Sequence, residues 1–331
     1  MRAQAGEPNA GTGRLAHAKR RVDSMQPYRR YDAAADASAA LVIRWYSSSF
    51  GLATRLLGGQ VRQDVCNIYA LVRVADEVVD APRPGQDSTD RMVELEKLEQ
   101  ETYTALVTGS SSNLVVHAFA RTARRVGIGE DLVAPFFASM RTDLSRTDHD
   151  SASLATYIYG SAEVVGLMCL RAFLAGEPNS SHRYNELAPG AQRLGAAFQK
   201  VNFLRDFGDD SDGLGRSYLV GLHTDDHDNL DDLDEVIWNH WLDDIELDLA
   251  AAADVIPGLP TGCRMAVCAA HDLFAELTRR LRETSPVEAR HRRVRVPTPE
   301  KVRIAASAAL RRGRPRAAGK PRAFAKGYNH S

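Results

Sequence analysis

The chain has 331 residues, of which 44% are hydrophobic and 26% charged, with a formal net charge of −1. This composition is ordinary for a soluble globular protein, and the length suffices to bury a substantial core in one domain or two. No run approaches the ~18 consecutive apolar residues of a membrane span, so we expect no transmembrane helix.

Residues 1–35 are rich in Ala, Gly, Arg and Gln, lack a periodic apolar face and predict a disordered leader. No apolar stretch follows their basic residues, so we expect no signal peptide. The four cysteines form no CxxC pair and no zinc spacing. Cys66 and Cys169 lie in apolar helical runs, which predicts reduced thiols and a cytoplasmic location.

From about residue 36 the apolar periodicity becomes helical and stays so. Clusters of Gly, Ser or Pro end the predicted helices, which span 39–57, 62–80, 89–107, 113–126, 130–145, 153–174, 184–210, 233–253, 263–283 and 297–310. Only 294–296 alternates as a strand would. The sequence therefore predicts an all-α fold with one helical domain over 36–312 and a basic disordered tail over 313–331.

The predicted helix 62–80 carries a charged row on an otherwise apolar surface. Arg73, Asp76, Glu77 and Asp80 fall three or four residues apart and share one face. Like charges at this spacing cost an isolated helix roughly 0.2–0.5 kcal/mol, and burying an ionised carboxylate costs several kcal/mol more unless it is compensated. No lysine is in register to neutralise this acid pair.

A second polar row lies far along the chain, in the predicted helix 184–210. It consists of Gln199, Asn202, Asp206 and Asp210, which share one face of an apolar segment. Two solvated helix ends could explain one acid pair, but they explain two pairs inside apolar segments poorly. The cheapest compensation for two facing acid pairs is a set of divalent cations, because Mg²⁺ binds through a few carboxylates plus substrate phosphates.

Two other stretches each allow two interpretations. The hydroxyls of Ser47, Ser48 and Ser49 precede an apolar helix, where they are either ordinary helix residues or ligands of phosphate oxygens. Gly160 and Gly166 interrupt a helical run at ~1 kcal/mol each relative to alanine. They indicate that a ligand chain or another helix lies close.

The segments 69–80 (YALVRVADEVVD) and 199–210 (QKVNFLRDFGDD) resemble the two signature motifs of the squalene/phytoene synthase family, in the expected order. The resemblance extends over about residues 38–312 and includes 47–57, 157–166, 216–219 and 293–297. It implies a single-domain, all-helical isoprenoid-synthase bundle around a central apolar cavity, with an aspartate-rich lip on each of two facing helices.

The resemblance also implies a role for each matching residue. The catalytic metal ligands for Mg²⁺ or Mn²⁺ would be Asp76, Asp80, Asp206 and Asp210, aided by Asn202. Diphosphate oxygens would be held by Arg73, Arg205, Arg216 and Tyr218, and the substrate-binding set would also include Ser47, Ser49, Tyr69, Tyr157 and Gln199. Ser48 stands where family members often have lysine, so one phosphate contact would be missing or supplied elsewhere.

The implied activity is that of a prenyltransferase that joins two prenyl diphosphates head to head. We expect two geranylgeranyl diphosphates to give phytoene through a cyclopropyl diphosphate, in carotenoid biosynthesis. The alternative is squalene or dehydrosqualene formation from two farnesyl diphosphates, with NADPH required only for squalene. A non-catalytic scaffold relative is a remote alternative, because such relatives have eroded aspartates and this chain keeps them.

Charge is distributed unevenly over the second half of the chain. Residues 206–254 include sixteen Asp or Glu and one Arg, whereas the chain from Arg290 onward has thirteen Lys or Arg and one acid, Glu300. Such a basic end indicates an anionic partner. Nucleic acid is not expected, because no aromatic residue is interleaved before Phe324. We expect reversible peripheral contact of the tail with anionic lipid.

Overall fold

The computed structural model describes residues 26–47, 49–146, 148–208, 218–219, 232–311 and 314–315. Every regular element within these ranges is a helix, which confirms the predicted all-α class. Residues 1–25 of the predicted leader and 316–331 of the predicted tail lie outside the described ranges, so the expectations for them stay predictions.

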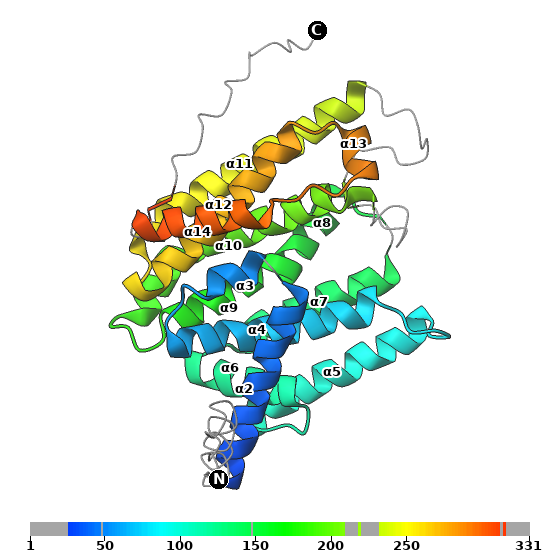
Figure 1. Ribbon diagram of the computed structural model, residues 1–331. Coiled ribbons are helices and arrows are strands. Elements are labelled where there is room, and N and C mark those ends of the chain that lie inside the picture. Colours follow the sequence, from blue (N-terminus) through cyan, green and yellow to red (C-terminus); the bar gives the residue numbers. More distant parts are fainter. Residues whose placement is uncertain are drawn as a thin grey trace, which may run out of the picture.

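The helices pack in two groups with a shared middle (Figure 1). Helices α11, α12 and α14 lie together on one side, α4 to α7 lie on the other, and α9 and α10 lie between them. The elements are α2 (Pro27–Tyr46), α3 (Ser49–Thr54), α4 (Gly59–Asp80), α5 (Ser88–Thr108), α6 (Leu114–Val126), α7 (Glu130–Ser145), α8 (Ser151–Ile158), the π-helix η1 (Tyr159–Glu163), α9 (Val164–Phe173), α10 (Ser180–Arg205), α11 (Asp232–Val255), the 3₁₀-helix η3 (Ile256–Gly258), α12 (Thr261–Arg282), α13 (Pro286–His291) and α14 (Thr298–Leu310).

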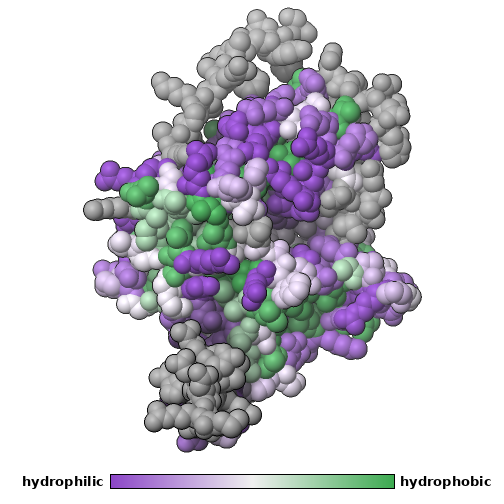
Figure 2. All heavy atoms as spheres, viewed as in Figure 1, coloured by the Kyte–Doolittle hydropathy of each residue, from purple (hydrophilic) through white to green (hydrophobic). Residues whose placement is uncertain are grey.

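Each group of helices encloses buried apolar side chains. Val201, Leu242 and Leu277 belong to the cluster that joins α10, α11 and α12. Leu71 and Phe137 belong to the cluster among α4 to α7 and α9. On the face shown in Figure 2, hydrophilic residues gather around α13, and hydrophobic residues reach the surface around α3.

The helical domain begins earlier than the predicted boundary at residue 36. Helix α2 starts at Pro27, whose fixed φ suits the first turn of a helix. The hydroxyl of Tyr31 donates to the carbonyl oxygen of Ser111 (2.9 Å), and Asp32 Oδ1 lies 2.8 Å from His117 Nε2. Residues 27–35 were thus wrongly assigned to the leader, because the contacts that hold them come from distant residues of the loop before α6 and of α6 itself.

The predicted helix 39–57 is divided in two. Helix α2 ends at Tyr46, and Ser47 takes an extended conformation (φ −137°, ψ 114°). The hydroxyl oxygen of Ser47 accepts a hydrogen bond from the backbone N–H of Phe50 (3.1 Å), as an N-terminal cap does. Ser47 therefore marks a break between helices and is no ordinary helix residue.

The predicted helix 184–210 also ends early. Helix α10 stops at Arg205, and Asp206 leaves the helical conformation (φ −103°, ψ 11°). Gly208 then packs so closely on α13 that a Cβ there would lie 1.9 Å from the carbonyl oxygen of Arg290. The second acid row therefore does not continue along one helix, and Asp206 lies at the end of α10.

The two glycines of the 157–168 run lie against other helices. A Cβ on Gly160 would lie 2.2 Å from the carbonyl oxygen of Pro135 in α7, and one on Gly166 would lie 2.5 Å from that of Ala191 in α10. Gly160 belongs to η1, and π-helical turns are frequent at functional sites. Close helix packing thus explains both glycines.

One continuous helical stretch within the described ranges, Ser151–Phe173, is long and apolar enough to cross a membrane by length and composition alone. It comprises α8, η1 and α9, which pack against α4, α7 and α10 inside the bundle. These contacts are those of a core helix, so the stretch is weak evidence for a membrane span.

Candidate active site

A cavity of about 1680 Å³ lies between the helix groups. Its charged lining residues include those from the C-terminal parts of α4 and α10, whereas earlier turns of α10 contribute Leu187, Ala191 and Leu194. From Leu187 to Arg205 a helix rises roughly 27 Å at 1.5 Å per residue. The cavity therefore has a charged end and a long apolar remainder, which suits a ligand with an anionic head and a hydrocarbon chain.

The acid row of α4 faces this cavity. Tyr69, Arg73, Asp76 and Asp80 all line it, and all lie on one face of the helix, as their spacing predicted. Burial, with the nearby carboxylates Asp80 and Asp143, raises the pKa of Asp76 to about 7. The neighbouring Arg73 therefore does not offset the effects of burial and of the nearby acids on Asp76.

Arg73 lies beside these acids, and one nitrogen of its guanidinium lacks a hydrogen-bond acceptor among the described residues. It pairs with Glu77 one turn along α4, and its guanidinium carbon lies 4.5 Å from the centre of the Tyr46 ring. Arg73 Nε is buried and has no hydrogen-bond partner among the residues that the structure describes. A buried donor without an acceptor is costly, so the arrangement favours an anionic oxygen from a ligand at this point.

The polar row of α10 lines the same cavity. Gln199, Asn202, Arg205 and Asp206 all contribute to its wall. Asp206 accepts hydrogen bonds from Arg205 Nε (2.9 Å) and Nη2 (2.6 Å), and Arg293 Nε lies 2.7 Å from its Oδ1. Asp210 and Arg216 lie outside the described residues, so the structure does not test their expected roles.

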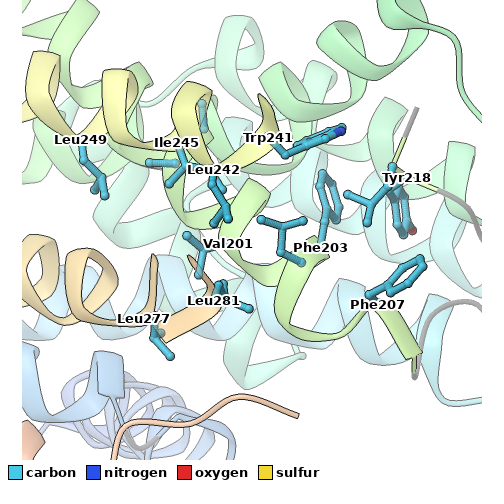
Figure 3. Close-up of a cluster of buried hydrophobic side chains, with 14 of the residues drawn as sticks. Val201, Phe203, Phe207, Tyr218, Trp241, Leu242, Ile245, Leu249, Leu277 and Leu281 are labelled. Atoms are coloured by element: carbon cyan, nitrogen blue, oxygen red, sulfur yellow. The ribbon is translucent and has the colours of Figure 1, made fainter. Parts of the chain in front are cut away.

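An aromatic wall adjoins the charged end. Tyr157 and Tyr218 line the cavity and are buried, and the Tyr218 ring stacks on Phe203 with centroids 4.5 Å apart. Figure 3 shows these two rings face to face, with Trp241 beside Phe203. Both tyrosine hydroxyls donate to Asp143, at 3.0 Å and 2.8 Å. The hydroxyl hydrogen of Tyr218 thus points to Asp143, and the diphosphate contact that the resemblance implies for Tyr218 stays a prediction.

The hydroxyl-rich stretch before α3 is only partly described. Ser47 lines the cavity while it caps α3. Ser48 and the side chain of Ser49 lie outside the described residues. The neighbouring Phe50 ring stacks on Tyr69 with centroids 5.5 Å apart and also lines the cavity. The structure therefore places Ser47 at the cavity and leaves the phosphate-binding role of the three serines untested.

Several cavity residues have no role in the sequence prediction. Asp143 has no other acid three or four residues away in the sequence, so no spacing pattern indicated a functional role. Arg293 and Arg295 belong to the segment 293–297, which the family resemblance includes. The resemblance assigned neither arginine a role. The polar lining residues beyond the predicted set include Arg280, Lys301, Arg293, Arg295 and Asp143. Basic residues thus gather at the cavity from the C-terminal part of the chain.

The donor set of α4 suits a divalent cation. Asp76 and Asp80 supply carboxylate oxygens, and a cation would offset both the burial and the repulsion from Asp80 that raise the pKa of Asp76. Within the described ranges no group of three or more His, Cys, Asp or Glu side chains is assembled to hold a metal. Mg²⁺ needs no such group, because it keeps waters and binds through one or two carboxylates plus substrate phosphates.

The helical bundle surrounds a cavity that is charged at one end and apolar beyond it, which is the architecture that the sequence resemblance implied. The chain belongs to the squalene/phytoene synthase family, whose model matches residues 43–300. Helices that carry both acid rows lie within that match.

Related sequences come from several organisms. A 15-cis-phytoene synthase from Paracoccus sp. is 29% identical over 260 residues, which cover 74% of this chain and 82% of the relative. A phytoene synthase from Arthrospira platensis is 31% identical over 181 residues (53% and 57%). A 4,4'-diapophytoene synthase from Staphylococcus haemolyticus is 27% identical over 173 residues (51% and 56%). The last two matches thus span little more than half of each relative.

Solved structures show the same fold. A dehydrosqualene synthase in complex with a ligand superposes with a TM-score of 0.72 at 21% identity, covering 86% of this chain and 99% of the other. A squalene synthase from Alicyclobacillus acidocaldarius superposes with a TM-score of 0.61 at 17% identity, covering 89% and 99%. At these identities the likeness concerns the fold alone.

Proposed function

We propose that this protein is a phytoene synthase, which condenses two geranylgeranyl diphosphates head to head in carotenoid biosynthesis. The observation that carries the proposal is the joining of both polar rows to one cavity with a long apolar remainder. The 29% identity to the Paracoccus 15-cis-phytoene synthase over most of both chains supports the choice of product.

Asp76 and Asp80 on one side, and Asp206, Asp210 and Asn202 on the other, would hold Mg²⁺ or Mn²⁺ in the proposed enzyme. The cations would stabilise the negative charge that develops on the departing diphosphate. The proposed diphosphate ligands are Arg73, Arg205, Arg216, Ser47 and Ser49, and the proposed cavity-lining contacts are Tyr69, Tyr157, Gln199 and Tyr218.

In the proposed reaction, the first diphosphate leaves an allylic carbocation in the cavity. The apolar and aromatic lining, which includes Phe203, keeps water from it. The double bond of the second prenyl chain attacks the cation, and proton loss gives a cyclopropyl diphosphate. Departure of the second diphosphate is followed by rearrangement and loss of a proton, which yields the conjugated triene of phytoene.

A direct incubation tests the proposal. Purified protein with Mg²⁺ is given geranylgeranyl or farnesyl diphosphate, with and without NADPH, and the hydrocarbons are analysed. We expect a C40 triene from geranylgeranyl diphosphate, independent of NADPH. Asp76→Ala and Asp206→Ala should abolish turnover while the helical fold persists. Full activity in either variant would refute the assignment.

The alternative product is dehydrosqualene or squalene from two farnesyl diphosphates. Its support is the 27% identity to the Staphylococcus haemolyticus 4,4'-diapophytoene synthase. The same incubation distinguishes the two functions, because this alternative gives a C30 hydrocarbon from farnesyl diphosphate, and NADPH is consumed only if the product is squalene.

We further propose that the basic tail attaches the protein reversibly to anionic membranes, where a hydrocarbon product can partition. The support is the excess of Lys and Arg after residue 290. Vesicles that contain anionic lipid should bind the full chain and lose binding when residues 311–331 are deleted. Unchanged binding after the deletion would remove this proposal.

A further inference from the structure

Asp143, near the end of α7, links two tyrosines of the aromatic wall. Its Oδ2 accepts a hydrogen bond from the Tyr157 hydroxyl (3.0 Å), and its Oδ1 accepts one from the Tyr218 hydroxyl (2.8 Å). Tyr157 comes from α8, whereas Tyr218 follows α10 in the chain. One carboxylate thus fixes side chains from two distant segments, with a different oxygen for each.

The direction of these bonds has a chemical consequence. An ionised carboxylate only accepts hydrogen bonds, so both tyrosines must donate. Their hydroxyl hydrogens are directed to Asp143, and their ring faces remain at the cavity wall. Tyr157 and Tyr218 are 5% and 7% exposed and both line the cavity. The cavity wall therefore presents electron-rich groups at this point.

The same bonds fix the tilt of the rings. Tyr218 lies between two ring neighbours, with centroids 4.5 Å from Phe203 and 5.2 Å from Tyr157. The Phe203 ring in turn meets Trp241 edge to face at 6.4 Å (Figure 3). Aromatic faces attract cations only within a limited range of positions. The hydrogen bonds from the tyrosine hydroxyls to Asp143 therefore determine which ring face a cation in the cavity meets.

We propose that Asp143 is a positioning residue for the reaction, which holds Tyr157 and Tyr218 so that their ring faces meet the carbocation. This inference rests on the proposed function. Asp143 acts through the two tyrosines, so its contribution is to the chemical step and leaves prenyl diphosphate binding unaltered.

The variant Asp143→Asn tests the proposal, since it keeps the size of the side chain. Its amide group donates, so at least one tyrosine must turn its hydroxyl hydrogen away. We expect kcat to fall about 10- to 100-fold, as for small misplacements of catalytic groups, with KM and the Mg²⁺ requirement unchanged. The matched control Asp131→Asn, at an exposed position in the first turn of the same helix, should keep parental kcat.

A variant that lacks the hydroxyl groups of Tyr157 and Tyr218 distinguishes a positioning role of Asp143 from other roles. In Tyr157→Phe/Tyr218→Phe protein, Asp143→Asn should change kcat less than about twofold, because the groups it positions are gone. The proposal is overturned if Asp143→Asn loses as much activity there as in the parent.

Other results for Asp143→Asn and for the parental protein also decide the matter. If Asp143→Asn does not fold, Tyr218→Phe decides, because a tether predicts a fall in kcat, whereas a diphosphate ligand predicts a rise in KM. Parental kcat in a folded Asp143→Asn overturns the inference while the proposed function stands. A parental protein that makes no hydrocarbon from either diphosphate overturns the proposed function, and this inference with it.

Discussion

Arg293 Nε lies 2.7 Å from Asp206 Oδ1, so the segment that follows α13 is bound to the end of α10. Arg205 donates two further hydrogen bonds to the same carboxylate. A cation at Asp206 must therefore compete with a guanidinium or share the carboxylate with it. Arg293 neutralises this acid in the structure, and in the proposed enzyme it would meet a diphosphate when a cation replaces it.

Arg293→Ala should separate these two roles. Without the Arg293 guanidinium, Mg²⁺ should bind the substrate-free protein about fivefold tighter, since a partly exposed ion pair contributes about 1 kcal/mol. The KM for geranylgeranyl diphosphate should rise, because positive charge leaves the cavity. Calorimetric titration and steady-state kinetics measure the two effects.

The control for this change is Arg303→Ala on α14, whose guanidinium is 64% exposed and pairs with Glu300. It should leave Mg²⁺ binding unaltered. Weaker Mg²⁺ binding by Arg293→Ala, with KM unaffected, would contradict competition at Asp206.

Asp76 should make the metal-free protein less stable as the pH rises. Its pKa is 3.8 in the unfolded reference and about 7 in the folded protein, so between these values the folded state holds the extra proton. Stability then falls as pH increases across that window. Asp76→Asn cannot titrate, so in chelator at pH 8 it should be more stable than the parent by about 1–2 kcal/mol, a discounted figure for a side chain in contact with the cavity.

Thermal unfolding in chelator at pH 5.5 and pH 8 measures this effect, which should reach several degrees. Mg²⁺ should stabilise the parent at pH 8 and leave Asp76→Asn nearly unaffected. The exposed Glu96→Gln on α5 serves as the control. Equal pH slopes in parent and Asp76→Asn would show that Asp76 titrates as an ordinary surface acid.

Local sequence patterns predicted those features of the site that depend only on the geometry of a single helix. The row Arg73, Asp76, Glu77 and Asp80 could be predicted because spacings of three or four residues put side chains on one face. All but Glu77 line the cavity. The end of α10 could not, because it depends on the approach of Arg290 to Gly208 from a distant segment. Asp143 was missed for the same reason, since its meaning comes from tyrosines that only the folded chain brings to it.

Gly160→Ala should disturb the contact between η1 and α7. The added Cβ would lie 2.2 Å from both the carbonyl oxygen of Pro135 and Ser139 Oγ. The Ser139 hydroxyl also donates to the carbonyl oxygen of Tyr157 (3.1 Å), so the disturbance reaches the aromatic wall. We expect a loss of about 1–3 kcal/mol of stability, typical of overpacking, together with reduced kcat.

Chemical denaturation and turnover of the same preparation measure both effects. Gly59→Ala, in the first turn of α4 with no heavy atom within 4 Å of the added Cβ, is the matched control and should change stability by less than about 0.5 kcal/mol. If Gly160→Ala were as stable as this control, the contact between η1 and α7 would be able to accommodate a Cβ at no cost in stability.

Lys200 should be required for stability because it sits between two acids of α11. Its Nζ donates to Asp244 and lies 2.7 Å from Asp248 Oδ2. Asp248 is fully buried, and its other oxygen accepts from Arg193 (2.7 Å). Lys200→Met leaves this buried carboxylate with one cationic partner, and breaking a buried ion pair typically costs 3–5 kcal/mol.

Since Arg193 remains, we expect Lys200→Met to lose about 2–3 kcal/mol, measured by denaturant unfolding. Adding Asp248→Leu to Lys200→Met should recover part of the loss, because it removes the buried charge that the first change exposes. The exposed Lys97→Met on α5 should be near neutral. If Lys200→Met were also near neutral, Arg193 alone would suffice to neutralise Asp248, and the contact between α10 and α11 would rest on its apolar side chains.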